Sequence, residues 1–194
     1  MELIDRIDEA RERWDVLKHP FYVRWERGEL TRDELAHYAG EYRHAVVALA
    51  RAAEAAGDEQ HAREESDHIE LWDDFAGALD APLDREPAAE TRGCSDAWAR
   101  NDRLEALAVL YAIESAQPAI SETKLRGLVE HYGFAEGPAT EYFVLHAKRD
   151  IEHAAEARDA LVEASPKDEN GLVAAAEAAL RVNWELLDGV ERAA

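Results

Sequence analysis

Apolar and charged residues are interleaved along most of this chain with a helical period, because apolar positions recur every three or four residues. This spacing is typical of amphipathic α-helices, and runs with the two-residue period of a β-strand are scarce. We therefore predict an all-α bundle without strands. The predicted helices cover about residues 2–17, 31–56, 58–79, 101–116, 121–132, 138–163 and 169–190, with a short helical turn at 22–27.

Residues that start and stop helices support these limits. Thr31 and Glu34 have the spacing of a capping box at the start of a long helix, and Gly57 ends that helix. The segment 81–95 contains two prolines and a glycine, and we predict a loop there. Pro118 ends or kinks the apolar helix before it.

The segment 101–116 is the most apolar part of the chain, and an unbroken apolar run covers 106–113. A helix that is apolar almost all round belongs in the centre of a bundle. Glu114 follows directly after this run. A carboxylate in such a place must be protonated, hydrogen-bonded or bound to a cation. A buried glutamate that serves a tyrosine or a backbone amide is the alternative to a metal ligand.

Three polar residues interrupt the apolar face of the segment 138–163. His146, Asp150 and His153 are separated by four and then three positions, which places them within about 60° of arc on a helix. The other residues on this face are mostly apolar, so we expect the face to be buried. Two imidazoles and a carboxylate cost several kcal/mol to bury unpaired, and a metal ion is the natural partner. A solvated polar face is the alternative.

A second polar group lies near the start of the predicted helix 58–79. It comprises four residues within roughly 100° of arc, namely His61, Glu64, Glu65 and His68. Glu65 and His68 have the i, i+3 spacing used by di-iron proteins of the helical-bundle type. The same spacing also arises in acidic helices that bind no metal.

Together the two helices and Glu114 offer two or three carboxylates and three histidines. This set suits one or two iron or manganese ions, because carboxylates bind hard ions and histidines complete the coordination. The absence of cysteine from the set argues against structural zinc. Glu41, on the apolar side of the helix 31–56, is a further candidate ligand, with a supporting or surface role as the alternative.

Length and charge restrict the class of protein. A chain of 194 residues suits one domain over 1–194, and the net charge of -21 argues against binding to nucleic acid or to anionic membranes. Cys94 is the single cysteine, so no internal disulfide forms, and we assign it no catalytic role. The sequence starts without the pattern of a signal peptide and contains no apolar run of about 18 residues. We predict a cytoplasmic protein.

The segment 19–35, followed by Tyr38 and Tyr42, resembles the opening signature of the TenA and pyrroloquinoline quinone synthase superfamily. That resemblance implies the haem-oxygenase-like fold, a bundle of about seven helices. Within the superfamily the chain most resembles the family of the chlamydial protein associating with death domains, whose members include self-sacrificing 4-aminobenzoate synthases. The matching segments are 21–25, 68–72, 111–118, 124–128 and 146–153.

The resemblance implies a dinuclear centre of two metal ions, either Fe/Fe or Mn/Fe. Its implied ligands in this chain are His68, Glu114, His146, Asp150 and His153. The family has one more glutamate ligand, on the same helix as the first of these histidines. In the family this glutamate lies seven residues before the histidine, and the residue seven positions before His68 in this chain is His61. We therefore expect Glu65 or Glu64 to take the place of the glutamate, with His61 as a competing ligand.

The resemblance also implies roles for Tyr22 and Lys124. In the 4-aminobenzoate synthases the matching tyrosine provides the aromatic ring, and the matching lysine is implicated as the amino donor. Taken without the resemblance, Tyr22 is a packing aromatic residue and Lys124 a surface residue with an apolar stem.

The expected function is that of an O2-activating oxygenase that converts its own tyrosine to 4-aminobenzoate, a folate precursor. It would need O2 and an external reductant, and by family analogy it would be a homodimer. A dimetal oxidase acting on a separate small amine or acid is one alternative, and a helical partner-binding protein without enzymatic activity is another. A TenA-type hydrolase is disfavoured because we expect no cysteine in a helical core position. A cofactorless quinone synthase would not need the His-Asp-His ligands.

Overall fold

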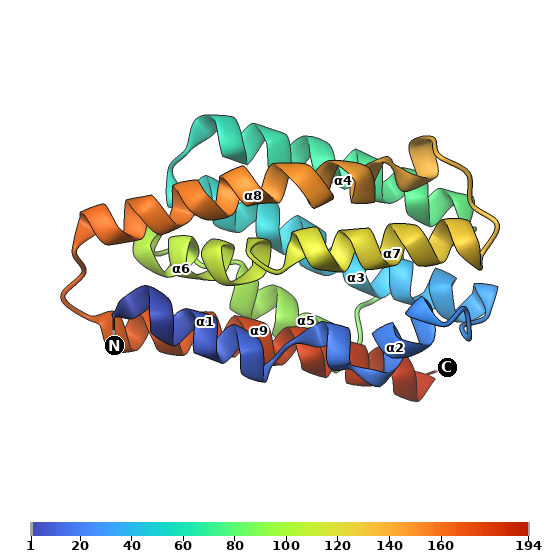
Figure 1. The fold of residues 1–194 in the computed structure, drawn as a ribbon, viewed down its shortest axis with the longest axis horizontal. Helices are drawn as coiled ribbons and strands as arrows, with labels where there is room; N and C mark the ends of the chain where they lie inside the picture. Colours follow the sequence, from blue (N-terminus) through green and yellow to red (C-terminus); the bar gives the residue numbers. More distant parts are fainter. Residues whose placement is uncertain (1, 194) are drawn as a thin grey trace.

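The computed structural model describes residues 2–193, and these residues form nine α-helices and one short 3-10 helix, with no strand among them (Figure 1). The all-α prediction is confirmed. The elements in chain order are α1 (Leu3–Arg13), η1 (Val16–Lys18), α2 (Pro20–Glu26), α3 (Arg32–Ala56), α4 (Glu59–Ala78), α5 (Ala89–Trp98), α6 (Arg103–Glu114), α7 (Gln117–Glu130), α8 (Pro138–Ala164) and α9 (Glu169–Ala193).

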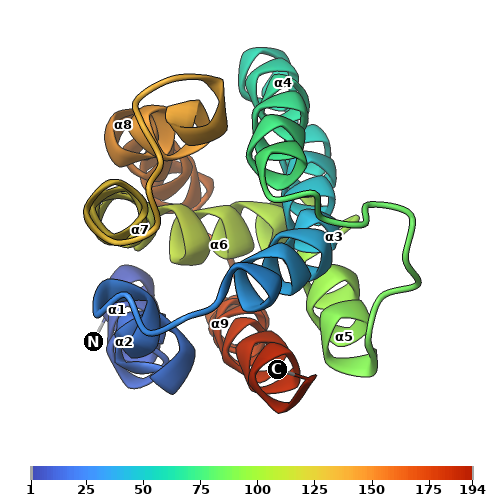
Figure 2. The same cartoon turned by 90° about the vertical axis from the view of Figure 1, so that its right-hand side faces the viewer.

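Helix α6 runs through the middle of the bundle, and the other helices surround it in the end-on view of Figure 2. It packs against α3, α8 and α9. Every residue from Ala106 to Glu114 is buried, as the apolar run predicts. Helices α4 and α8 lie side by side along one edge of the bundle and pack against each other (Figure 1). This pair and α6 carry most of the candidate metal ligands.

Local signals set the ends of α3 as predicted. The backbone N–H of Glu34 donates to the Thr31 hydroxyl at 3.2 Å, and the Glu34 carboxylate accepts from the backbone N–H of Thr31 at 2.7 Å. This reciprocal pair is a capping box. Gly57 ends the helix with φ of 85°, a left-handed conformation that glycine adopts without a steric penalty.

The predicted loop over 81–95 is wrong in its second half, because α5 begins at Ala89. Helix α5 packs against α3 and α9, and its Cys94 and Trp98 side chains are buried. Packing of this kind outweighs the low helix propensity of Gly93. The expectation that no cysteine occupies a helical core position is therefore wrong as well.

Two other helix limits differ from the prediction. The first helix ends at Arg13, and a separate 3-10 turn follows, whereas one helix to residue 17 was expected. Helix α7 begins at Gln117, four residues before the expected start. Pro118 lies in its first turn. Backbone N–H groups in the first turn have no acceptor within the helix, so a proline there removes no hydrogen bond.

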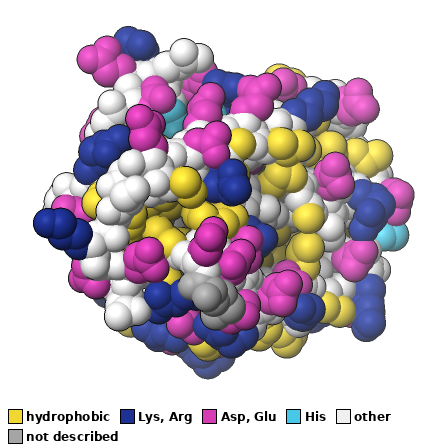
Figure 3. All heavy atoms as spheres, turned by 60° about the vertical axis from the view of Figure 1, so that its left-hand side comes forward, with side chains coloured by type: hydrophobic (Ala, Val, Ile, Leu, Met, Phe, Trp, Pro, Cys, Tyr) yellow, Lys and Arg dark blue, Asp and Glu magenta, His cyan; other side chains and the backbone are white. Residues whose placement is uncertain are grey.

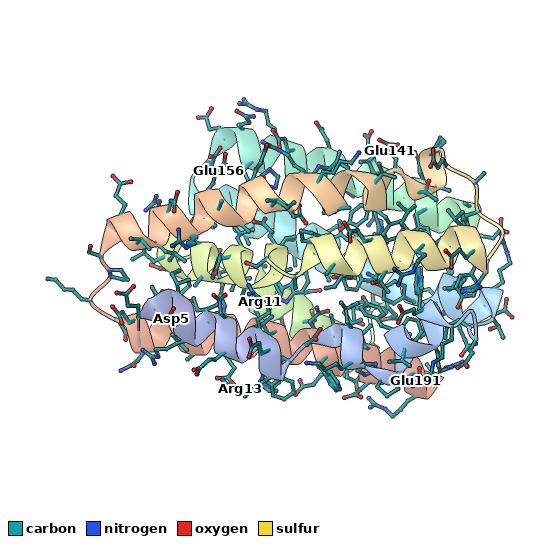
Figure 4. All side chains as sticks on the ribbon, viewed as in Figure 1. Asp5, Arg11, Arg13, Glu141, Glu156 and Glu191 are labelled. Carbon is teal, nitrogen blue, oxygen red and sulfur yellow. The ribbon has the colours of Figure 1, made fainter. Side chains whose placement is uncertain are left out.

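Charged side chains cover the outside of the bundle. Figure 3 shows acidic side chains spread over one whole face among basic and apolar ones. Figure 4 labels Arg13, Glu141 and Glu156, which lie on the outside and are exposed. Within residues 2–193, none of the helices combines the length and apolar character that crossing a bilayer requires.

Candidate metal centre

Helix α4 places three side chains of the predicted polar group in the interior. Its first turn is fixed by Asp58, whose carboxylate accepts hydrogen bonds from two backbone N–H groups of that turn. His61, Glu65 and His68 then follow at spacings of four and three residues, and all three are buried. The Glu65 Oε1 atom lies 2.9 Å from His68 Nδ1 and 3.8 Å from His61 Nε2.

Helix α8 turns His146, Asp150 and His153 into the same interior, and each is at most 1 % exposed. His146 Nδ1 lies 2.8 Å from the backbone carbonyl oxygen of Tyr142. Because a carbonyl oxygen only accepts, Nδ1 carries the proton and Nε2 presents its lone pair. Burial lowers the pKa of His146 to about 4, so the ring is neutral at physiological pH and able to bind a metal.

Helix α6 brings Glu114 to this place from the centre of the bundle. The residue is fully buried, and its Oε1 atom lies 2.9 Å from His61 Nε2 without the alignment of a hydrogen bond. Burial raises the pKa of Glu114 to about 7, although the nearby His61 ring opposes this shift. Burial and the Glu65 carboxylate also raise the pKa of Asp150 well above its usual range. A cation beside these carboxylates would stabilise their ionised forms.

The buried ligand atoms fall into two adjacent groups. In the first group the ligand atoms lie within 4.8 Å of one another, and its members are His61, Glu65, Glu114 and His153. The second group, within the same limit, consists of Glu65, His68 and His146. Glu65 belongs to both groups, so its carboxylate lies within reach of both sets of candidate ligand atoms.

The donor atoms of this region fit metal ions because they lack other partners. Of the buried side-chain N and O atoms without a hydrogen bond among the described residues, nine belong to the two groups and Asp150, and they come from His61, Glu65, His68, Glu114, His146, Asp150 and His153. Unpaired buried polar groups are costly and rare in folded proteins. Four imidazoles and three carboxylates form the nitrogen and oxygen donor set that iron and manganese prefer.

The structure separates the three candidates for the remaining ligand on α4. Glu65 lies inside both groups, and His61 lies in the first group. Glu64 lies at the rim with its side chain 28 % exposed, and it forms an ion pair with Arg149. Arg149 draws the pKa of Glu64 down to about 2. Arg149 is not among the residues predicted for the site, although its position four residues before His153 places the two side chains on one helix face.

Glu41 lies apart from both groups and has another partner. Its buried carboxylate accepts a hydrogen bond from the backbone N–H of Ala88 at 3.0 Å and another from the Thr91 hydroxyl. These donors belong to the start of α5, where a carboxylate stabilises the free N–H groups and the positive end of the helix dipole. Glu41 therefore joins α3 to α5, the supporting role that was the alternative.

A second buried cluster contains Tyr22 and Lys124. Lys124 Nζ donates a hydrogen bond to the Tyr38 hydroxyl at 2.6 Å, and the Tyr22 and Tyr38 hydroxyls lie 2.8 Å apart. Nζ also lies 4.6 Å from the centroid of the Tyr22 ring. Tyr22 and Lys124 thus lie together in the interior, and Lys124 is not the surface residue that was the alternative.

Lys124 lacks a carboxylate partner among residues 2–193, and burial lowers its pKa well below the usual value. Burial also raises the pKa of Tyr22. Burial thus favours the uncharged amine of Lys124 and the uncharged phenol of Tyr22. An uncharged amine has a free lone pair and is a nucleophile.

A series of neighbouring aromatic rings, one pair stacked and the others edge-to-face, joins the two clusters. Tyr142 stacks on His146 with ring centroids 3.9 Å apart, and it meets Trp72 edge-on at 4.8 Å. Trp72 lies 5.9 Å from Tyr38, which lies 6.0 Å from Tyr22. The aromatic series is thus continuous from a candidate metal ligand to the phenol. No sequence signal showed that these rings meet, because they come from four different helices.

Residues 23–184 match the model of a family described as an iron-containing redox enzyme. The chain belongs to this family. It is a metal-dependent oxidoreductase with a haem-oxygenase-like fold. A protein of Chlamydia muridarum named 4-aminobenzoate synthase is 32% identical, over 89% of this chain and 83% of the relative. One of Nitrosomonas europaea with the same name is 31% identical, over 96% of this chain and 89% of the relative.

Solved structures show the same fold at lower sequence identity. A protein of Shewanella denitrificans OS217 with a haem-oxygenase-like fold gives a TM-score of 0.80 at 21% identity, covering 99% of this chain and 93% of the other. A TenA homologue from P. horikoshii OT3 gives a TM-score of 0.78 at 15% identity and covers both chains completely. The predicted haem-oxygenase-like fold is therefore confirmed.

Proposed function

We propose that this protein is a 4-aminobenzoate synthase that consumes its own Tyr22 as the ring source and Lys124 as the amino donor, and so supplies a folate precursor. The relatives named 4-aminobenzoate synthase support this proposal. The observation that carries it is the meeting of the Lys124 amine and the Tyr22 phenol at one buried point.

The chemistry of the product explains why this geometry matters. 4-Aminobenzoate has the ring of tyrosine, with a carboxylate at the position of Cβ and a nitrogen in place of the phenolic oxygen. The Cα–Cβ bond of Tyr22 must therefore break, with O2 as the oxidant that converts Cβ to the carboxylate. A C–N bond must form at the carbon that bears the hydroxyl, where the C–O bond breaks, and the Nζ–Cε bond of Lys124 must break to leave the amino group on the ring. Lys124 Nζ and the Tyr22 hydroxyl both contact the hydroxyl of Tyr38, so the amine lies at the end of the ring where that bond forms.

The residues proposed to hold two metal ions are Glu65, His68, Glu114, His146, Asp150 and His153, with His61 as a further ligand. An iron pair or a manganese and iron pair supplies redox chemistry with O2 when bound, using electrons from an external reductant. The chain itself contributes the buried aromatic series, whose oxidisable rings link the ligands to Tyr22. Tyr38 orients the amine and the phenol by accepting from one and bonding to the other.

Intact-mass measurement tests this function. The protein is incubated in air with iron, manganese and a reductant, after growth with ring-labelled tyrosine. We expect a loss of mass from the chain and release of labelled 4-aminobenzoate. Tyr22→Phe should bind metal as the unchanged protein does and release none. An unchanged mass without 4-aminobenzoate would reject the proposal.

A pocket beside the first group favours a second candidate, a dimetal oxidase that acts on a separate small amine or acid. The pocket has a volume of about 370 Å³ and is lined by His61, Arg103, Leu107 and Glu156, among others. Its charged rim and apolar wall suit a small polar substrate. Turnover of an added acid or amine should survive Tyr22→Phe in this case, whereas self-sacrifice should not.

Cys94 does not favour a hydrolase of the TenA type. The thiol is buried in α5, and burial raises its pKa, so little reactive thiolate forms at physiological pH. A homodimer in the cytoplasm remains our prediction for the working enzyme.

A further inference from the structure

Glu64 occupies a position between a surface arginine and a buried candidate ligand. Its Oε2 atom accepts from Arg149 Nε at 2.7 Å and lies 2.9 Å from His153 Nε2. Its Oε1 atom accepts from Arg149 Nη2 at 3.1 Å and from Gln60 Nε2 at 2.9 Å. Both oxygens are thus engaged, and neither belongs to the two groups of ligand atoms.

The contact with Glu64 decides which nitrogen of His153 carries the proton. An ionised carboxylate only accepts hydrogen bonds, so Nε2 is the protonated nitrogen and Nδ1 keeps its lone pair. Nδ1 faces the interior, 3.7 Å from Glu65 Oε1 and 3.7 Å from Asp150 Oδ1, and has no hydrogen-bond partner. An imidazole ligand is commonly held in this way by a carboxylate on its outer nitrogen.

The two histidines of α8 therefore present opposite nitrogens to the interior, for different reasons. His146 is fixed by a backbone carbonyl, which no side-chain substitution removes. His153 is fixed by the side chain of Glu64, which is held in turn by the two N–H groups that Arg149 donates. Of these two histidines, only His153 has a tautomer that depends on a side chain, and a substitution can remove that side chain.

We propose that Glu64 is a positioning residue of the metal centre, which sets the tautomer and orientation of His153, and that Arg149 holds Glu64 in place. This inference rests on the proposed metal centre. It assigns Glu64 a place outside the ligand set, between the ligand His153 and the solvent-facing Arg149. Removal of such a carboxylate typically lowers metal affinity by about 10- to 100-fold.

Nitrogen NMR of metal-free protein labelled with 15N-histidine tests the first half of the proposal. In the unchanged protein His153 should appear as the Nε2–H tautomer. Glu64→Ala should convert it to a mixture of tautomers, and Arg149→Gln should shift it partly. Glu152→Ala is the matched control, because the Glu152 carboxylate also pairs with Arg149 but forms no hydrogen bond or ion pair with the His153 ring. An Nδ1–H tautomer in the unchanged protein, or no change in Glu64→Ala, would overturn the inference.

Metal titration of the same variants tests the second half. We expect Glu64→Ala to bind the same number of ions as the unchanged protein, with affinity lower by about 10- to 100-fold. Loss of one whole ion would show that Glu64 is itself a ligand and would overturn the positioning role. If the unchanged protein binds no metal, the proposed function fails, while the tautomer measured without metal still decides the hydrogen-bond half of the inference.

Discussion

The charge of Lys124 is the property on which the proposed amine chemistry depends most directly. The side chain is 3% exposed, and burial lowers its pKa well below the usual value. The faces of six aromatic rings lie 4.6 to 6.0 Å from Nζ and would favour the charged form. Removal of an unpaired ammonium from water costs more than such contacts return, so we expect the amine to be neutral in the native state.

This expectation gives a sign and a magnitude for the stability of the metal-free protein. An unfolded lysine keeps its proton up to a pKa of about 10.4, so above the native pKa the unfolded chain binds one more proton than the native state. The free energy of unfolding then rises with pH by about 1.36 kcal/mol per unit from this residue. Lys124→Met removes that slope. The stability of the variant relative to the unchanged protein should fall by about 2 kcal/mol between pH 8.0 and 9.5.

Urea denaturation of both proteins at several pH values in this window measures the difference. Taking the difference cancels the titration of groups that the two proteins share. Lys18→Met is the control, because the Lys18 side chain is 70% exposed and should give a nearly flat difference. A flat difference for Lys124→Met would show a charged lysine among the aromatic rings and would refute the reasoning.

Two further pairs of substitutions, each a test and its control, probe how the helices pack. A Cβ at Gly127 would lie 2.7 Å from Trp25 Cδ1, so Gly127→Ala should cost about 1–3 kcal/mol in urea denaturation and lower 4-aminobenzoate release. Gly93→Ala, with open space around its Cβ, should instead stabilise by up to about 1 kcal/mol, and an equal effect at both sites would contradict this account. Glu41→Ala should cost about 1–3 kcal/mol by leaving the start of α5 without its acceptor, whereas the exposed Glu54→Ala should be nearly neutral.

The parts of the fold that were predictable are those in which local and tertiary preferences agree. The apolar run before Glu114 predicts a central helix because no other position in a bundle buries all of its sides. Helix α5 was missed because its local signals, a glycine and two nearby prolines, point away from a helix. Its stability comes from contacts with α3 and α9 and from the Glu41 carboxylate, which are distant in sequence.

The candidate site likewise has a part that the local sequence pattern predicts and a part that only distant contacts determine. Periodicity alone places His146, Asp150 and His153 on one buried face, and the structure has them there. Periodicity does not tell which of Glu64 and Glu65 points into the interior, because adjacent helical residues are only about 100° apart. The packing of α4 against α8 separates them, since Arg149 pairs with Glu64 at the rim while Glu65 lies inside.

Metal content is the measurement that tests the central claim most directly. The protein is reconstituted with iron alone or with iron and manganese and then separated from unbound metal. Its metal content is measured by inductively coupled plasma mass spectrometry. We predict roughly two ions per chain, as in other dinuclear bundles, and loss of both in Glu65→Ala, because Glu65 belongs to both groups. An unchanged protein without bound iron or manganese, or a Glu65→Ala variant that keeps both ions, would contradict the account.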